Sequence, residues 1–555
     1  MFKIEIRENS KKLKEIVFSK PITIESLLQK EKMKLKERIG YKLNGVQFVN
    51  GNFELSSDSV VDIINFKSLE GYRIFQDSAV FILTKAFQNV FKKSAKMIVE
   101  HSIGDGIFCE VFHHDKLVQA DIDKLKAEMQ RIINNDLPIE KQILEEREAE
   151  DIFYELGRKD LLTYFKYVPK GIKIQIYRCG RFYDQFIRQL ADRTSSIVNF
   201  DIKLKEPGFI LQLPNRETGV LSNDCKFPEK LFEMNQEHDK WLNILKIHNV
   251  STLNKINQTG RLINMIQVEE ALHENKITKI VDKIVSKNNA KIVLIAGPSS
   301  SGKTTFAKRL GIQMQVAGLL PIIIGMDDYF LPRTKTPKKE DGSFDFESIH
   351  SLDLKLLNSD LNKLLDGKEI EQPKYNFVKV IQERSGKKLI LGKNKIVIME
   401  GIHGLNEELT KEIEKKFKFK IYISAINQLN IDDHNRIPTT DNRLIRRIVR
   451  DKNFRGYSAE ETLERWYDVR VGEEQNIFPF QENADEMFNS GLTYELAILK
   501  QYALRYLENV SKYSPMYLEA QRLILLLQHF EPIEESLVPK NSIIKEFIGS
   551  SAFEY

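Results

Sequence analysis

A glycine-rich segment at 297–304, GPSSSGKT, carries the clearest chemical signal in the sequence. It follows an apolar run and leads into a helical pattern, which is the context of a GxxxxGK[ST] phosphate-binding loop. The glycines allow backbone N–H groups to turn toward phosphate oxygens, and the helix N-terminus adds partial positive charge. We expect Lys303 to neutralise the outer phosphates of a nucleotide and the Thr304 hydroxyl to hold Mg²⁺. The residues predicted to bind the nucleotide are Gly297, Ser299, Ser300, Ser301, Gly302, Lys303, Thr304 and Thr305.

Acidic residues follow two other apolar runs. Asp327 and Asp328 come after the run 321–325, and Glu400 comes after the run 395–399. If both runs are parallel strands, these carboxylates lie at the carboxyl edge of a sheet, where ligands bind. A carboxylate at this edge can accept the proton of an attacking hydroxyl or order Mg²⁺. The alternative is that they are turn or helix-capping residues.

Arginines cluster in the segment 441–451, which has the pattern of a helix. Those that share one face are Arg443, Arg446, Arg447 and Arg450, and Arg455 follows on the next loop. Such a helix can close over a nucleotide and bring guanidinium groups to a phosphoryl group in transfer. The alternative is a solvated basic face held by salt bridges.

The elements that must position these residues alternate between strand and helix. Apolar runs at 291–296, 321–325, 395–399 and 419–423 are typical of buried strands, and helical patterns lie between them. This alternation predicts a doubly wound parallel sheet.

The rest of the chain has a different pattern. In residues 1–70, Phe2, Ile4 and Ile6 alternate with charged residues, and two Asn-Gly turn signals follow, which favours a small β-rich module. Residues 71–225 mix helical and strand patterns, and residues 226–285 are polar and helical. The chain ends with a predicted helix at 517–530 and a short one near Ile543.

The composition is that of a globular protein, with 42% hydrophobic and 29% charged residues. The 84 Lys and Arg against 79 Asp and Glu give a net charge of +5, too small over this length to argue for nucleic acid binding. Cys109, Cys179 and Cys225 lie far apart, which excludes a disulfide framework and a cysteine-only zinc site. No apolar run reaches the roughly 18 residues of a membrane span. We therefore expect a cytoplasmic protein without membrane contact.

Six motifs in order resemble the uridine kinase branch of the phosphoribulokinase/uridine kinase family. They are GPSSSGKTT, MDDYF, the segment 344–347, the segment 373–377, MEGIHGL and RLIRRIVRD. The resemblance covers about 290–500 and implies an ATP- and Mg²⁺-dependent nucleoside 5′-kinase, with uridine or cytidine as the default acceptor. The N-terminal half would then be non-catalytic.

The same resemblance assigns roles to residues. The implied catalytic residues are Asp327 as general base, Lys303, and the lid arginines Arg447, Arg450 and Arg455. The implied substrate-binding residues are Asp327, Glu347, Tyr375, Phe377 and Arg447, and the implied metal ligands are Thr304 and Glu400. The aromatic pair is expected to line a nucleoside pocket, because aromatic rings stack on bases.

Several positions depart from the family pattern. Glu347 stands where the family usually has a ribose-binding aspartate, and Val380 falls where pyrimidine kinases carry a base-reading histidine. Tyr457 and Arg465 replace an arginine and a glutamine of the lid. The phosphoryl-transfer parts are therefore complete, whereas the base-reading parts are altered, and loss of a hydrogen-bonding side chain can change base choice by orders of magnitude.

The N-terminal half resembles the TGS domain and the second N-terminal domain of threonyl-tRNA synthetase. The resemblance rests on Asn44-Gly45, the Ser-Leu-Glu-Gly71 segment, and the segments 101–108 and 177–184. Editing domains of this type use an HxxxH and a CxxxH pair for metal. The corresponding residues here are Phe81, Lys85, Phe186 and Leu190. Because none of these side chains can ligate a divalent ion as imidazole or thiolate does, we expect hydrolytic editing to be lost.

Together these observations predict a multidomain α/β protein. The expected domains are a TGS-like β-grasp at 1–70, a synthetase-editing-like α+β domain at 71–225, a helical connector at 226–285, a P-loop kinase domain at 286–515 and a helical tail at 516–555. The expected partners are a nucleoside, ATP and a second copy of the chain, with RNA contact through the N-terminal half left open. The alternatives are a nucleotide-sensing, RNA-binding regulatory protein and a kinase of a purine nucleoside or another small alcohol.

Overall fold

The computed structural model describes residues 1–33, 38–92, 94–113, 116–222, 227–339, 342–376, 379–427 and 429–554. The N-terminal module is a five-stranded sheet in the order β2-β1-β7-β4-β5. Its strands are β1 (Phe2–Glu8), β2 (Lys11–Phe18), β4 (Arg38–Leu43), β5 (Gln47–Val49) and β7 (Ser59–Asn65). Helix α1 (Ile24–Lys30) begins where the Thr23 side chain accepts a hydrogen bond from the Ser26 N–H. Ile4 and Ile6 face the core of this module, as their alternation predicts.

The second part of the N-terminal half is built around α2 (Leu69–Phe91) and α3 (Gln119–Asn134). Two antiparallel sheets accompany these helices, in the orders β13-β14-β9-β8 and β10-β11-β12. The strands are β8 (Ala95–Ile103), β9 (Gly106–His113), β10 (Glu140–Leu144), β11 (Ile174–Cys179), β12 (Phe182–Gln185), β13 (Asp201–Lys205) and β14 (Gly208–Gln212). Two short helices, α4 (Glu146–Glu155) and α5 (Lys159–Tyr167), complete it.

Apolar side chains and a lysine occupy the positions where an editing domain would hold a metal. The Phe81 ring centroid lies 5.6 Å from that of Phe186, and Leu190 is buried. The Lys85 ammonium donates a hydrogen bond to the Cys179 carbonyl at 3.0 Å. The tertiary structure therefore surrounds these positions with apolar and cationic packing.

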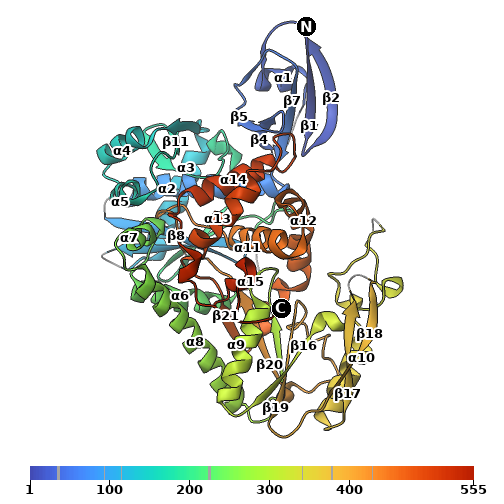
Figure 1. Ribbon diagram of the computed structural model, residues 1–555. Helices are drawn as coiled ribbons and strands as arrows, with labels where there is room; N and C mark the ends of the chain where they lie inside the picture. The colour runs from blue at the N-terminus through green and yellow to red at the C-terminus, as the bar shows by residue number, and fades with distance from the viewer. Residues whose placement is uncertain are drawn as a thin grey trace.

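The C-terminal half contains the predicted parallel sheet, which is confirmed. Its order is β16-β19-β15-β20-β21, and every neighbouring pair is parallel. The strands are β15 (Ile292–Ala296), β16 (Leu320–Gly325), β19 (Lys395–Gly401), β20 (Lys418–Ser424) and β21 (Glu486–Asn489). The sequence pattern does not predict β21, because four residues are too few to show a periodicity. An antiparallel hairpin, β17 (Ile370–Asn376) and β18 (Ile381–Leu389), projects from this half beside α10 (Leu354–Leu365) (Figure 1).

Helices cover this sheet from several parts of the chain. They are α9 (Lys303–Val316), α11 (Thr439–Arg450), α12 (Ala459–Asn476) and α13 (Glu495–Leu507). The segment predicted as a connector forms α6 (Glu229–Leu245), α7 (Val250–Gln258) and α8 (Leu262–Ser286). Helix α8 contacts α9 and α6 contacts β21, whereas α7 contacts α5 of the N-terminal half. The connector therefore packs the two halves together.

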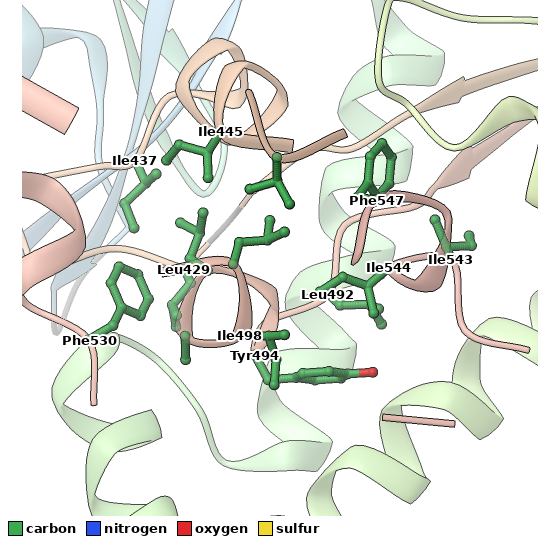
Figure 2. Packing of buried hydrophobic residues seen from close by; sticks show 14 of the residues in the cluster. Leu429, Ile437, Ile445, Leu492, Tyr494, Ile498, Phe530, Ile543, Ile544 and Phe547 are labelled. Atoms are coloured by element: carbon green, nitrogen blue, oxygen red, sulfur yellow. The ribbon is translucent and has the colours of Figure 1, made fainter. Parts of the chain in front are cut away.

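The C-terminal tail also returns to this core. Helix α14 (Tyr517–Gln528) packs against α13, and the short helix α15 (Lys545–Ile548) contacts α11. Ile543, Ile544 and Phe547 are fully buried among residues of the C-terminal half (Figure 2). None of the helices in the described ranges is long and apolar enough to span a bilayer.

A charged network joins the two halves of the chain. The His434 Nδ1 lies 2.7 Å from the Asp184 carboxylate, which also accepts from Arg158 at 2.7 Å. Burial by itself would lower the pKa of His434, but the Asp184 carboxylate reverses this and leaves the pKa raised. The charged form of His434 is therefore favoured by its position between the halves.

This arrangement predicts a pH dependence of stability. Because the folded pKa of His434 is raised, its contribution is full below the unfolded value of about 6.5 and is lost as the pH rises through the folded pKa. We expect the parent protein to lose up to about 2 kcal/mol of unfolding free energy between pH 6 and pH 8.5 through this group, and His434→Gln to lack this loss. Urea unfolding at both pH values measures this, with the exposed His248→Gln as the matched control. An identical pH slope in the parent and His434→Gln proteins would contradict the assignment.

Candidate active site

The phosphate-binding loop lies between β15 and α9, as predicted. Gly302 has φ of +80°, a conformation that only glycine adopts without strain. At Gly297 a Cβ atom would lie 2.0 Å from the Ile423 carbonyl oxygen, so the loop and β20 approach each other closely. The Lys303 ammonium donates to the carbonyls of Gly297 at 2.9 Å and Pro298 at 3.1 Å. Burial lowers the pKa of Lys303. The loop is thus a tight turn whose carbonyls at Gly297 and Pro298 hold the Lys303 ammonium.

Two oxygen ligands meet beside the loop at the carboxyl edge of the sheet. The Thr304 hydroxyl donates to the Glu400 carboxylate at 3.1 Å. Burial, opposed by the charge of Lys303, raises the pKa of Glu400 to about 6. A hydroxyl and a carboxylate are hard oxygen donors of the kind Mg²⁺ prefers, and Mg²⁺ needs few protein ligands because it keeps waters and phosphate oxygens. The residues present therefore fit a magnesium ion.

The adjacent acids Asp327 and Asp328 have different surroundings. They lie in a 3₁₀ turn, Met326–Tyr329, directly after β16. Asp328 accepts hydrogen bonds from the Tyr375 N–H at 3.4 Å and the Gln372 amide at 3.3 Å. The Asp327 side chain remains accessible to solvent. Partial dehydration by the surrounding walls raises the pKa of Asp327, and the charge of Lys303 opposes that shift. Asp328 therefore holds the hairpin, while Asp327 is open to a substrate.

The arginines of α11 divide into two groups, which the sequence pattern does not predict. Arg443 and Arg446 are fully buried and support the loop from behind. Arg443 pairs with Glu473 at 2.7 Å and donates to the Ser299 carbonyl at 3.1 Å. Arg446 pairs with Glu495 through its Nε at 3.0 Å and donates to the Ser300 carbonyl at 3.3 Å. These two guanidinium groups are structural.

The other three arginines surround one carboxylate. Arg447, Arg450 and Arg455 place a nitrogen 3.2, 3.5 and 3.5 Å from Asp451. Burial, together with the charge of Arg455, lowers the pKa of Arg450 to about 10. Arg447 also donates to the Ser299 hydroxyl at 2.8 Å. Three cations against one anion leave excess positive charge beside the loop, which favours a polyphosphate.

The acceptor side of the site has an acidic and an aromatic wall. Burial raises the pKa of Glu347, which lies near Glu473 and Arg447. Tyr375 is buried and its ring centroid lies 5.4 Å from that of Phe330. Phe377, the second predicted aromatic, lies outside the described residues.

The departures of the lid from the family pattern are physically linked. The Arg465 guanidinium stacks over the Tyr457 ring with 4.0 Å between the guanidinium carbon and the ring centroid. The two replaced positions therefore interact with each other, which is a cation–π contact.

Sequence reasoning misses two acidic residues at this site. The Glu473 carboxylate accepts from the Ser299 N–H at 2.9 Å. Burial alone would raise its pKa, but Arg443 reverses this and holds the pKa below its usual range. Glu546 of the tail accepts from the Thr305 hydroxyl at 2.7 Å. Only their place in the fold distinguishes these glutamates from many others in the chain.

Comparison with known proteins gives two separate matches. Residues 292–497 match the model of the Phosphoribulokinase / Uridine kinase family. Uridine kinase of Lactobacillus helveticus is 30% identical over 208 residues, which cover 37% of this chain and 90% of that protein. The N-terminal half matches threonine–tRNA ligases. That of Carboxydothermus hydrogenoformans is 29% identical over 149 residues, 27% of this chain and 23% of that one.

Threonine–tRNA ligase 1 of Bacillus subtilis is 30% identical over 168 residues, 30% of this chain and 26% of that protein. The chain thus spans about a quarter of the length of these ligases. By contrast, it spans nearly all of the uridine kinase. The region matched by the family model contains the loop, Thr304, Glu400, Asp327 and the arginine cluster. Through residues 292–497, the chain belongs to the phosphoribulokinase/uridine kinase family.

Proposed function

We propose that this protein is an ATP-dependent nucleoside 5′-kinase, with uridine as the default acceptor. The observation that supports this most directly is the meeting of four groups at one sheet edge: the Lys303 loop, the Thr304–Glu400 pair, the open Asp327 and the three arginines around Asp451. In-line phosphoryl transfer needs a phosphate cradle, a metal, a proton acceptor and charge stabilisation. We assign each of these four requirements to one of the four groups.

The phosphate-binding groups define the donor side. Backbone N–H groups of the loop and the Lys303 ammonium hold the phosphates. The Thr304 hydroxyl and the Glu400 carboxylate would hold Mg²⁺, which when bound neutralises charge on the phosphate oxygens.

Asp327 and the arginines act on the reacting atoms. The Asp327 carboxylate accepts the proton of the acceptor's 5′-hydroxyl while the oxygen of that hydroxyl forms a bond to the γ-phosphorus. The bond from that phosphorus to the β,γ-bridging oxygen breaks, and ADP leaves. Arg447, Arg450 and Arg455 stabilise the charge on the phosphoryl group during transfer. The proton remains on Asp327 until the product departs.

The residues on the acceptor side favour a nucleoside but do not determine which base it carries. Tyr375 offers an aromatic face and Glu347 a carboxylate for ribose hydroxyls. Val380 cannot make the hydrogen bond of the histidine that pyrimidine kinases have at this position. A purine nucleoside is therefore the second candidate acceptor, favoured by this substitution.

A substrate panel tests the proposal. The purified chain is incubated with Mg-ATP and, separately, uridine, cytidine, inosine, guanosine, adenosine or ribulose 5-phosphate. We expect phosphorylated product and ADP from one nucleoside class, and none from the Lys303→Ala variant. Turnover of ribulose 5-phosphate alone would replace the nucleoside acceptor with a sugar phosphate. If ATP binds but no acceptor turns over, the alternative of a nucleotide-sensing, RNA-binding protein is favoured.

A further inference from the structure

The C-terminal tail places a carboxylate on the first turn of the phosphate-loop helix. The Glu546 Oε2 accepts hydrogen bonds from the Thr305 backbone N–H at 3.3 Å and from the Thr305 hydroxyl at 2.7 Å. Thr305 is fully buried. It lies immediately after Lys303 and Thr304 in α9, so its N–H belongs to the first turn of the helix, where donors point away from the helix body.

This donor belongs to the anion-binding surface of the loop. First-turn N–H groups of such a helix point at phosphate, and the helix dipole favours negative charge there. Glu546 is also close enough to act on Lys303, Glu400 and Arg450, because its charge contributes to the pKa shift of each. The carboxylate therefore occupies the region where the phosphates of a nucleotide would bind.

The tail that carries Glu546 is firmly anchored. Ile543 packs onto Gly302, where an added Cβ would lie 2.5 Å from the Ile543 Cγ2. The guanidinium carbon of Arg446 lies 5.0 Å from the centroid of the Phe547 ring. Figure 2 shows Ile543, Ile544 and Phe547 of the tail among the buried hydrophobic residues. Glu546 itself is only partly buried, so its side chain can rotate away while the tail stays in place.

The tail also contacts the arginine-bearing lid. The Asn453 amide, in the π-helical turn Asp451–Arg455, donates to the Phe547 carbonyl at 3.2 Å. Phe454 of the same turn approaches Gly549, where an added Cβ would lie 3.4 Å from its ring. The residues on both sides of Glu546 are thus bound to the loop and to the lid.

We propose that Glu546 is a built-in competitor of the nucleotide. Its carboxylate occupies the Thr305 N–H that a nucleotide phosphate would take, and nucleotide binding displaces it. This inference rests on the nucleotide site of the proposed function but concerns a segment outside the region matched by the family. Its consequence is an affinity for ATP and ADP that is lower than the loop alone would provide, set by an acidic residue of the tail.

Nucleotide affinity of tail variants tests this directly. Titration calorimetry of the full chain with Mg-ADP and with Mg-ATP measures Kd without any acceptor or turnover. We expect Glu546→Gln and Glu546→Ala to bind both nucleotides about tenfold more tightly than the parent. Glu554→Gln removes the same charge from an exposed position of the same tail and is expected to leave Kd unchanged.

The outcomes separate this inference from the kinase proposal. Equal affinity in the parent and both Glu546 variants overturns the competitor role and leaves the kinase standing. Weaker binding in the variants also overturns it, because Glu546 would then be a ligand of the nucleotide or its metal. Absence of binding in all proteins overturns the nucleotide site and the inference with it. If circular dichroism shows that Gln or Ala misfolds, Glu546→Asp keeps the charge with a shorter reach and is expected to bind more tightly than the parent.

Discussion

Replacing Asp327 with asparagine is expected to lower kcat by about 10²–10⁴-fold, the contribution of a positioned general base. Asparagine keeps the size and the hydrogen-bonding capacity of the side chain but cannot accept a proton from the acceptor hydroxyl. Because Asp327 is not one of the groups that cradle the phosphates, we expect the Kd for Mg-ATP to change by less than about threefold. Steady-state kinetics with the best acceptor of the panel and titration calorimetry with Mg-ATP measure these two quantities.

The neighbouring acid provides the matched control. Asp328→Asn makes the same chemical change one residue away, at a carboxylate that is bonded to Tyr375 and Gln372. We expect its effect to fall mainly on the KM of the acceptor, because the hairpin carrying Tyr375 loses an anchor. A larger loss of kcat in Asp328→Asn than in Asp327→Asn would assign the base to Asp328 and contradict our assignment.

Truncation of Arg446 is expected to destabilise the C-terminal half by about 3–5 kcal/mol. The side chain is fully buried and bonds to Glu495, Ser300 and the Ser490 carbonyl. In Arg446→Ala the Glu495 carboxylate, 1% exposed, loses its charged partner and remains in the core with its charge uncompensated, although it still accepts from the Leu492 N–H. Urea unfolding followed by tryptophan fluorescence measures the loss, since Trp466 is buried in the hydrophobic core.

Two further variants determine whether this loss comes from the unpaired charge. Arg455→Ala removes an arginine that is half exposed, so we expect little change in stability and a large fall in kcat. The double variant Arg446→Met/Glu495→Leu removes both charges and is expected to recover most of the lost stability. A double variant as unstable as Arg446→Ala would show that packing, not the unpaired carboxylate, controls the effect.

The sequence alone predicted the parts of this protein that depend on local pattern. The loop at 297–304 combines glycines, a lysine and a threonine at set spacing after a buried strand, and each of these features is visible within a dozen residues. Strands β15, β16 and β19 are continuous apolar runs, and the run of β20 is interrupted only by Lys420. This pattern is typical of parallel strands buried on both faces, but the edge strand β16 leaves Leu320 and Ile323 exposed. Asp327 and Glu400 could then be located at the sheet edge, because every parallel strand in such a sheet ends on the same side.

Local pattern is less informative where elements are short or where helices extend beyond their apolar stretch. Strand β21 has four residues and goes undetected. Helix α2 begins at Leu69, inside the segment 1–70 predicted as the β-rich module, because the Ser68 side chain caps it. The helical connector was predicted, but its contacts with α9, β21 and α5 were not. Such contacts depend on which side of the sheet each helix crosses, and spacing does not encode this.

Only the tertiary structure decided how residues of the same type divide their roles. Arg443 and Arg446 look the same as Arg447 and Arg450 on a helical projection, yet the first two are buried against Glu473 and Glu495 and the others face Asp451. Glu546 lies 241 positions from Thr305 in the chain. The physical reason is that a charge takes its role from its partners and its burial, and both come from segments distant in sequence. The sequence determined that a phosphate-loop motif follows a buried strand, and the fold decided which charges surround that loop.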